Sequence, residues 1–188
     1  MNKAKNKSTP VMKQFWSIKE KHPNSILLFR MGDFYETFEK DAEITSNILG
    51  IALTKRANGA ASSVALAGFP YHSLDQHMYK LLKAGHRVAI CEQIENPKDA
   101  KGIVKRGVVE VVSPGTAISE KFLDSKRNNF LCCVYHAGIN LGFSVLDHST
   151  GEFHCGEWPL SDFENVIRQF NVKEILWFIP LCGLQFFL

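Results

Sequence analysis

An apolar segment that runs into a glycine turn constrains this chain more than any other feature. Residues 26–30 read Ile-Leu-Leu-Phe-Arg, a short apolar run typical of a strand that is covered on both faces. The turn at Gly32 follows, and Phe34 and Glu36 come directly after it. An aromatic ring can stack on a nucleic-acid base, and a carboxyl group can form a hydrogen bond at the base edge. The segment therefore predicts a strand and turn that carry two groups suited to probing a base.

The first 115 residues predict a domain built on a mixed sheet. Thr9 and Pro10 are residue types preferred at the N-cap and first position of a helix, which we expect to end at His22. A second helix is expected from Phe34 to Gly50, because apolar residues recur there at helical spacing. The other predicted elements are strands at 26–30, 51–55, 64–67, 87–91 and 108–112, a helix at 73–85, and loops at 57–63 and 95–107.

A second domain is predicted after a linker. The pair Pro114-Gly115 ends the first domain at residue 115, and residues 116–128 are interpreted as the linker. The second domain, residues 129–188, is expected to be truncated, because its elements make up about half of an α/β domain. The predicted fold class of the whole chain is mixed α+β. The elements of the second domain are an antiparallel meander at 130–135, 140–146 and 152–158, a helix at 162–170 and a strand at 174–179.

Composition is typical of a soluble globular protein. Of the 188 residues, 45% are apolar and 22% are charged. The first eight residues are polar and lysine-rich with no apolar stretch after them, so we expect neither a signal peptide nor a membrane anchor. The five cysteines form no C-x-x-C pair, which indicates a reducing compartment without disulfides or a zinc site. We therefore expect a cytoplasmic protein.

Positive charge is concentrated in the first part of the chain. Residues 1–116 carry 17 Lys and Arg against 11 Asp and Glu, a net charge of +6, whereas residues 117–188 carry 5 against 8, a net charge of −3. The first part can therefore meet a polyanion. Lys55 and Arg56 stand before a loop of small residues and suit phosphate contact, although a solvated strand end has the same pattern. Four further cations form either a second phosphate-binding group or a solvated face: Lys98, Lys101, Lys105 and Arg106.

The motifs of enzymes are incomplete in this chain. Asp33 and Glu92 stand at two strand ends, as in metal-dependent endonucleases, but Ile94 occupies the place of the lysine that those enzymes need. The strand at 130–135 lacks the carboxylate that RNase H-type cleavage requires. Residues 102–107 have the two glycines of a phosphate-binding loop, but valines follow where Lys and Ser or Thr are needed. We expect no catalytic residues, metal or cofactor here.

Several motifs occur in one order along the chain, and together they resemble a known family. They are Thr9-Pro10, LFRMGDFYE at 28–36, LTKR at 53–56, AGFPYH at 67–72, AICEQ at 89–93 and SPGT at 113–116. This set resembles the N-terminal mismatch-recognition domain of the bacterial MutS family of DNA mismatch repair proteins. LDHSTGEF at 146–153 resembles the start of that family's connector domain. The resemblance extends from about Thr9 to Trp158, and the tail at 181–188 does not share it.

The resemblance implies a role for five residues. Phe34 is the wedge that stacks on a mispaired base in a kinked duplex, and Glu36 forms a hydrogen bond to that base. Lys55, Arg56 and Arg106 contact the DNA backbone around the kink. The first domain, residues 9–115, then has the family's mixed α/β fold. The second, residues 129–188, is a truncated RNase H-like connector.

The resemblance also implies partners and cofactors. The expected ligand is double-stranded DNA with mismatches or small loops, in the bacterial cytoplasm at the nucleoid. Full-length family members form homodimers through C-terminal domains and work with a MutL-type repair protein. Their ATPase domain uses ATP and Mg²⁺, and its motif is missing here, so we expect no enzyme activity from this chain.

Other interpretations remain open from the residues alone. Phe34 and Phe38 are four residues apart, which is also typical of a buried helix face. The chain can also be a metal-dependent endonuclease-like domain, or a MutS-like paralogue that acts on DNA junctions. The combination of Phe34 with Glu36 argues against the paralogue, because a protein that does not probe bases has no need for both.

Overall fold

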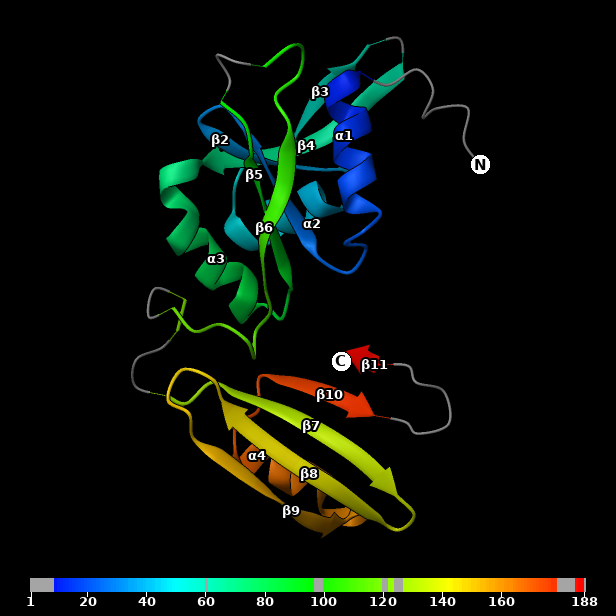
Figure 1. The fold of residues 1–188 in the computed structure, drawn as a ribbon, viewed down its shortest axis with the longest axis vertical. Coiled ribbons are helices and arrows are strands. Elements are labelled where there is room, and N and C mark those ends of the chain that lie inside the picture. The colour runs from blue at the N-terminus through cyan, green and yellow to red at the C-terminus, as the bar shows by residue number, and fades with distance from the viewer. Residues whose placement is uncertain are drawn as a thin grey trace. The chain divides into compact units, whose positions relative to one another are not determined.

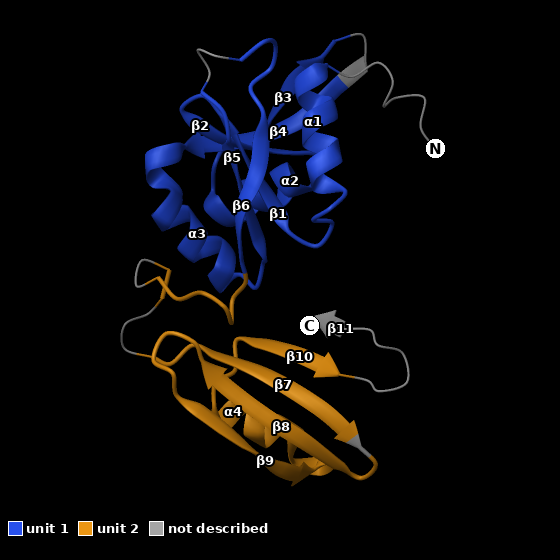
Figure 2. Cartoon of the chain, in the orientation of Figure 1, with its two compact units in different colours: residues 1–112 blue, residues 113–188 orange. Residues whose placement is uncertain are grey.

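The computed structural model describes residues 9–59, 61–96, 100–119, 122–123, 127–178 and 185–187. The chain divides into two compact units, Met1–Val112 and Ser113–Leu188 (Figures 1 and 2). Each unit has a mixed sheet with helices, so the predicted mixed α+β class is confirmed. Lys98, the tail at 181–184 and parts of the predicted linker lie outside the described residues. None of the described helices is long and apolar enough to span a membrane.

The first unit is organised around a six-stranded sheet. Its strand order is β3-β4-β2-β1-β5-β6, in which β1 and β5 are parallel and the other neighbours are antiparallel. The prediction of a loop at 57–63 is wrong for residues 57–58 and 61–63, which lie in the paired strands β3 and β4. The strands are β1 (Ile26–Met31), β2 (Phe34–Phe38), β3 (Thr54–Asn58), β4 (Ala61–Pro70), β5 (Val88–Gln93) and β6 (Arg106–Val112).

The described part of this unit also has three α-helices: α1 (Pro10–Lys19), α2 (Lys40–Leu49) and α3 (Leu74–Lys83). Thr9 is the N-cap of α1, and its hydroxyl accepts a hydrogen bond from the Met12 N–H at 3.4 Å. Gly50 ends α2 with a left-handed backbone, φ +68°. The predicted start of α1 and end of α2 are therefore confirmed. Ser73 precedes α3, but its side chain forms no capping hydrogen bond.

The prediction that the second helix starts at Phe34 is wrong. Residues 34–38 form the strand β2, which pairs with β1 on one side and β4 on the other. The misleading signal is the four-residue spacing of Phe34 and Phe38, which also fits a strand, where every second side chain shares a face. Neighbouring residues settle the assignment: Tyr35 and Thr37 are buried on the opposite face. Phe34 is thus a strand residue next to the turn.

The junction between β2 and α2 is strained at Glu39, which has φ 53° and ψ −126°. Such a backbone costs roughly 1–3 kcal/mol for a residue with a Cβ, whereas glycine adopts it freely. We expect Glu39→Gly to raise the free energy of unfolding by about 1 kcal/mol. Urea unfolding measures this change. As a control, Glu43→Gly lies inside α2 and is expected to lose about 1 kcal/mol; a loss of stability in Glu39→Gly would contradict the expectation.

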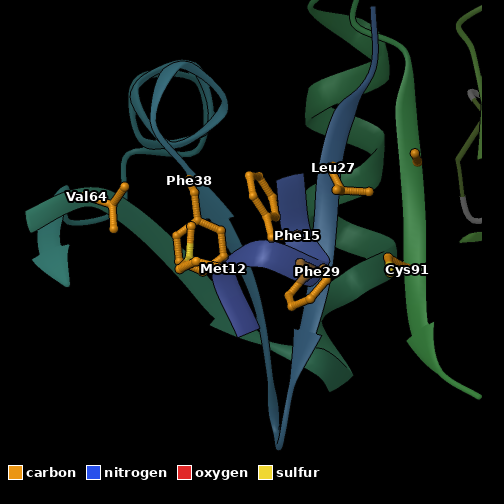
Figure 3. Packing of buried hydrophobic residues seen from close by; sticks show 8 residues of the cluster. Met12, Phe15, Leu27, Phe29, Phe38, Val64 and Cys91 are labelled. Atoms are coloured by element: carbon orange, nitrogen blue, oxygen red, sulfur yellow. The ribbon is translucent and has the colours of Figure 1, made fainter. Parts of the chain in front are cut away.

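The main core of this unit lies between α1 and one face of the sheet. Phe15 of α1 makes edge-to-face contacts with Phe29 of β1 and Phe38 of β2, with ring centroids 5.6 Å and 4.8 Å apart. Figure 3 shows these rings with Met12 and Leu27 in the same buried cluster. On the opposite face, Phe69 of β4 packs against His77 of α3, with ring centroids 4.3 Å apart. The sheet therefore has an α1 face and an α3 face.

A partly buried ion pair links three elements of the first unit. The Lys19 ammonium, at the end of α1, lies 2.8 Å from the Asp41 carboxylate in α2. The same carboxylate accepts the Leu27 N–H of β1 at 2.9 Å. Asp41 is only 6% exposed, so this side chain fixes α2 against β1 from inside the protein.

The second unit contains the meander that was predicted. Strands β7, β8 and β9 are antiparallel neighbours, and β10 pairs with β7 in parallel. Helix α4 buries Val166 against the cluster on this sheet. The sheet order is β11-β10-β7-β8-β9. The bounds are β7 (Phe130–Ala137), β8 (Asn140–Asp147), β9 (Phe153–Pro159), α4 (Phe163–Gln169), β10 (Glu174–Phe178) and β11 (Gln185–Phe187).

The segment after β6 is fixed within the second unit by Glu174. The Gly115 N–H donates to the Glu174 carboxylate at 2.9 Å, and the Ser113 hydroxyl donates to the same oxygen. A Cβ on Gly115 would lie 2.8 Å from the Glu174 Cβ, so a larger residue has no room here. In the structure, residues 113–115 therefore pack with the second unit, whereas the Pro114-Gly115 pair predicts that they end the first domain.

Candidate nucleic-acid interface

Phe34 is an exposed aromatic residue at the start of β2. It follows the tight turn at Gly32, whose φ of +60° favours glycine. Its neighbours in the sheet are Met31 of β1 and Pro70 of β4. The side chain is 46% exposed, although the two other phenylalanines on this part of the α1 face, Phe29 and Phe38, are buried. A ring left open in this way can stack on another flat group.

Arg30 and Tyr71 hold the turn beside Phe34. The Arg30 Nε donates to the Gly32 carbonyl oxygen at 2.5 Å, and its guanidinium lies 4.0 Å from the centre of the Tyr71 ring. The Tyr71 N–H donates to the Asp33 carbonyl oxygen at 2.9 Å. These contacts hold the backbone of the turn at both of its ends, and Phe34 directly follows this turn.

Glu36 shares the α1 face with Phe34 and is half-buried. Its Oε2 lies 2.6 Å from the Arg56 Nη1 of β3, which makes a charge-assisted hydrogen bond. Burial raises the pKa of the Glu36 carboxyl above its usual value, and the charges of Arg56 and then Arg106 partly oppose this effect. Glu36 is therefore a carboxyl group whose environment brings it closer to protonation than a solvated glutamate.

Gly68 of β4 makes room next to this carboxyl. It is the sheet partner of Glu36, and a Cβ at this position would lie 2.9 Å from the Tyr35 carbonyl oxygen and 3.4 Å from the Glu36 Cγ. A side chain at residue 68 would therefore push against both the backbone of β2 and the Glu36 side chain. Because glycine has no Cβ, no side chain projects from this position of the α1 face.

The three predicted cations occupy different environments. Arg56 lies on the α1 face opposite Val64, whereas Lys55, the next residue, is exposed on the other face of the edge strand β3. Arg106 lies on the α1 face, where its Nε donates to the Arg30 carbonyl oxygen at 2.5 Å and its Nη1 donates to the Val104 carbonyl oxygen at 2.8 Å. The structure thus brings Phe34, Glu36, Arg56 and Arg106 to one face, and places Lys55 apart.

Arg106 is more enclosed than the sequence suggests. A further hydrogen bond joins its Nη1 to the Gln14 side chain of α1 at 3.1 Å, and its guanidinium lies 5.0 Å from the centre of the Phe29 ring. Burial lowers the pKa of its guanidinium, while the negative charge of Glu36 acts in the opposite direction. Arg106 therefore links β1, β6 and α1 and adds positive potential near Glu36.

The carboxylate of Glu92, compared above with an endonuclease ligand, is used inside the protein. It accepts a hydrogen bond from the Tyr35 hydroxyl, and the Arg30 Nη1 lies 3.7 Å away. Burial, followed by the interaction with Glu92, raises the pKa of the Tyr35 hydroxyl, which keeps its proton. In the part of the chain that the structure describes, no three His, Cys, Asp or Glu side chains form a group that could hold a metal ion.

The raised pKa of Glu36 predicts how stability depends on pH. A carboxyl whose pKa is raised by folding favours the folded state below its unfolded pKa, and this contribution is lost as pH rises through the folded pKa. Replacing Glu36 with glutamine removes the titration. We therefore expect the free energy of unfolding of Glu36→Gln, relative to wild type, to increase between about pH 4 and pH 7. Urea unfolding at several pH values measures it, and a constant or falling difference would contradict the assignment.

Comparison with known families tests the resemblance. The family model described as MutS domain I matches residues 9–121, which is more than half of the chain and includes all five candidate residues. The chain belongs to the MutS domain I family. The predicted resemblance is therefore confirmed for this part of the chain.

Relatives of the MutS domain I chain are named DNA mismatch repair protein MutS. The protein from Phocaeicola vulgatus is 53% identical over 169 residues, which is 90% of this chain and 19% of the relative. The Porphyromonas gingivalis protein is 53% identical over 168 residues, 89% of this chain and 19% of the relative. The Flavobacterium johnsoniae protein is 52% identical over 170 residues, which is 90% of this chain and 20% of the relative. The chain thus spans about a fifth of the length of these curated relatives.

Several residues that shape this candidate interface do not stand out in the sequence. Arg30, Gly68 and Tyr71 fall inside the quoted motifs, but no role was assigned to them. Their functions depend on contacts between strands, and a single sequence does not show strand register. The one usable signal was Pro70, because a proline has no N–H to donate to the sheet and is therefore found where pairing stops.

Proposed function

We propose that this chain is a mismatch-sensing DNA-binding module from the N-terminal part of a MutS-type repair protein. The proposal rests on the exposed ring of Phe34. The ring follows a turn that is held by hydrogen bonds, and the Glu36 carboxyl lies two residues along the same strand face. Phe34 is the wedge that enters the minor groove and stacks on the mispaired base. Glu36 forms a hydrogen bond to that base, and Lys55 and Arg56 contact the backbone around the kink.

The energetics support a wedge that selects mispairs. Unstacking one base step costs a few kcal/mol, and stacking an aromatic ring on a base returns about 1–3 kcal/mol. These two quantities nearly cancel on matched DNA. A mispair stacks poorly, so a kink costs less there, and a small saving decides the binding equilibrium. Phe34 therefore favours sites where the DNA duplex kinks easily, and Glu36 adds a contact with the base edge.

The positive charge of the first unit supports contact with DNA. Lys55 and Arg56 lie on the edge strand β3, and Arg56 keeps 35% of its side chain exposed. Arg106 acts in this proposal mainly through its positive charge, because its Nε and Nη1 groups donate to protein atoms. The salt dependence of affinity is expected to be low, in keeping with about two phosphate contacts.

Further roles are proposed for the second unit and for the full-length protein. The second unit is proposed to be the beginning of the RNase H-like connector. ATP hydrolysis with Mg²⁺, homodimer formation and work with a MutL-type partner are proposed for the full-length protein, through domains that lie outside this chain. The proposed location is the bacterial cytoplasm at the nucleoid. This chain alone is proposed to bind DNA weakly and without catalysis.

Binding to a pair of duplexes tests the proposal. Fluorescence anisotropy is measured with two labelled duplexes of the same sequence that differ only in one mispair. The expected result is tighter binding to the mispaired duplex and no cleavage of either duplex in Mg²⁺. Equal affinity for both would contradict mismatch sensing. Cleavage that depends on Mg²⁺ would favour the endonuclease interpretation instead, and a preference for a four-way junction would favour the paralogue.

Glu36→Gln tests the role of the carboxyl group in the same assay. A carboxylate near phosphates is repelled, so removing its charge is expected to keep or raise the affinity for both duplexes. The preference for the mispair should shrink, because the amide replaces a carboxyl that can donate or accept according to its protonation. A preference equal to that of wild type would refute a reading role for Glu36.

A further inference from the structure

Arg56 contacts the carboxyl group proposed to read the base, although it comes from a different part of the sheet. Glu36 lies on β2 opposite Gly68, and Arg56 lies on β3 opposite Val64, four residues earlier on β4. The Arg56 side chain therefore extends along the α1 face, past the strand between them, to reach Glu36 at 2.6 Å. This contact therefore holds the Arg56 guanidinium and the Glu36 carboxylate in position relative to each other.

The hydrogen bonds of Arg106 go to other groups than this carboxyl. Both cations face Glu36, and both favour its charged form. However, the Nε and Nη1 groups of Arg106 already donate to Arg30, Val104 and Gln14, and its role is to join α1 to the sheet. Arg56 is the cation whose hydrogen bond to Glu36 the structure shows, and its side chain is more exposed than that of Glu36, 35% against 18%.

We propose that Arg56 is a positioning residue for Glu36, and that their ion pair sets how strongly the chain discriminates a mispaired duplex from a matched one. The inference rests on the proposed function. Arg56 cancels the charge that would otherwise repel Glu36 from the phosphates, and it fixes the carboxyl beside Phe34. Because arginine presents several donors in one plane, the same guanidinium can hold Glu36 and still offer N–H groups to a phosphate.

Lys55 provides a matched control for this role. It is adjacent to Arg56 on β3, carries the same charge and is exposed, but it lies on the other face of the strand. Lys55→Met and Arg56→Met therefore remove the same charge from the same edge of the sheet. Only Arg56→Met removes the contact with Glu36. Arg56→Lys is the conservative variant, since it keeps the charge without the planar fork.

The first measurement needs no DNA. Carbon-13 NMR of the side-chain carboxyls follows the titration of Glu36 in the full chain. The pKa of Glu36 is expected to rise in Arg56→Met, to stay unchanged in Lys55→Met, and to lie between wild type and Arg56→Met in Arg56→Lys. A Glu36 pKa that is the same in all four proteins would overturn the inference, because Arg56 would then not act on the carboxyl.

The second measurement is the ratio of affinities for the mispaired and matched duplexes. Lys55→Met is expected to weaken both affinities and leave the ratio unchanged, whereas Arg56→Met lowers the ratio by about fivefold. In a Glu36→Gln background, Lys55→Met and Arg56→Met should have the same effect on this ratio of affinities. A wild-type ratio of one contradicts the proposed function itself. A wild-type preference that Arg56→Met leaves intact contradicts only the positioning role.

Discussion

Replacing Phe34 with alanine is expected to remove most of the preference of this chain for a mispaired duplex. The ring is the exposed group at the turn, and a stack between an aromatic ring and a base is worth about 1–3 kcal/mol. Affinity for the mispaired duplex should therefore fall by about 5–150-fold, toward the affinity for the matched duplex. Stability should change by less than about 0.5 kcal/mol, because the side chain is not part of the core.

Phe153→Ala is the matched control for this experiment. Phe153 also begins a strand, β9 in the second unit, and its side chain is 57% exposed. The substitution removes the same ring from a surface that the proposal does not use, so both duplexes should bind as they do to wild type. If Phe34→Ala keeps the full preference, or if Phe153→Ala loses it, Phe34 is not the wedge.

The largest expected loss of stability comes from Asp41→Ala. This substitution leaves the Leu27 N–H without its acceptor and the Lys19 ammonium without its counter-ion, at a site where Asp41 is 6% exposed. Removing one partner of a buried, hydrogen-bonded pair typically costs 3–5 kcal/mol, and because Lys19 keeps some access to water we expect about 3 kcal/mol. Urea unfolding followed through amide resonances of the first unit measures this change.

Two further variants make the Asp41 result interpretable. Asp41→Asn keeps an oxygen for the Leu27 N–H and loses only the charge, so its expected loss is about half as large. Glu43→Ala, two residues along the same helix and exposed, should change stability by less than about 0.5 kcal/mol. Losses below 1 kcal/mol in Asp41→Ala would show that this carboxylate does not hold α2 against β1.

Much of the fold follows from local patterns in the sequence. Thr9-Pro10 and Gly50 have chemistry specific to helix ends, and the apolar run at 26–30 leaves few alternatives to a buried strand. The error at Phe34 arose because a four-residue spacing satisfies a helix and a strand alike. The true length of β4 was hidden for another reason: its first part is made of small residues, whose pairing with β3 depends on the rest of the sheet.

The candidate site was predictable only in part. Phe34 and Glu36 stand two residues apart, so the sequence alone can group them as one candidate site. The contact between Glu36 and Arg56 crosses β4, and it depends on a strand register that no local pattern specifies. Likewise, the charge of Arg106 is visible in the sequence, but its hydrogen bonds to Arg30 and Gln14 are a product of the fold.

The most direct test of the account is a map of the DNA contact on the chain by NMR. Amide resonances are followed while a short duplex with one mispair is added, and the matched duplex serves as the comparison. The largest shifts are expected on residues 32–36 and 55–56, and those of Phe34 and Glu36 are expected only with the mispaired duplex. Shifts centred on the second unit, with residues 32–36 unchanged, would contradict it.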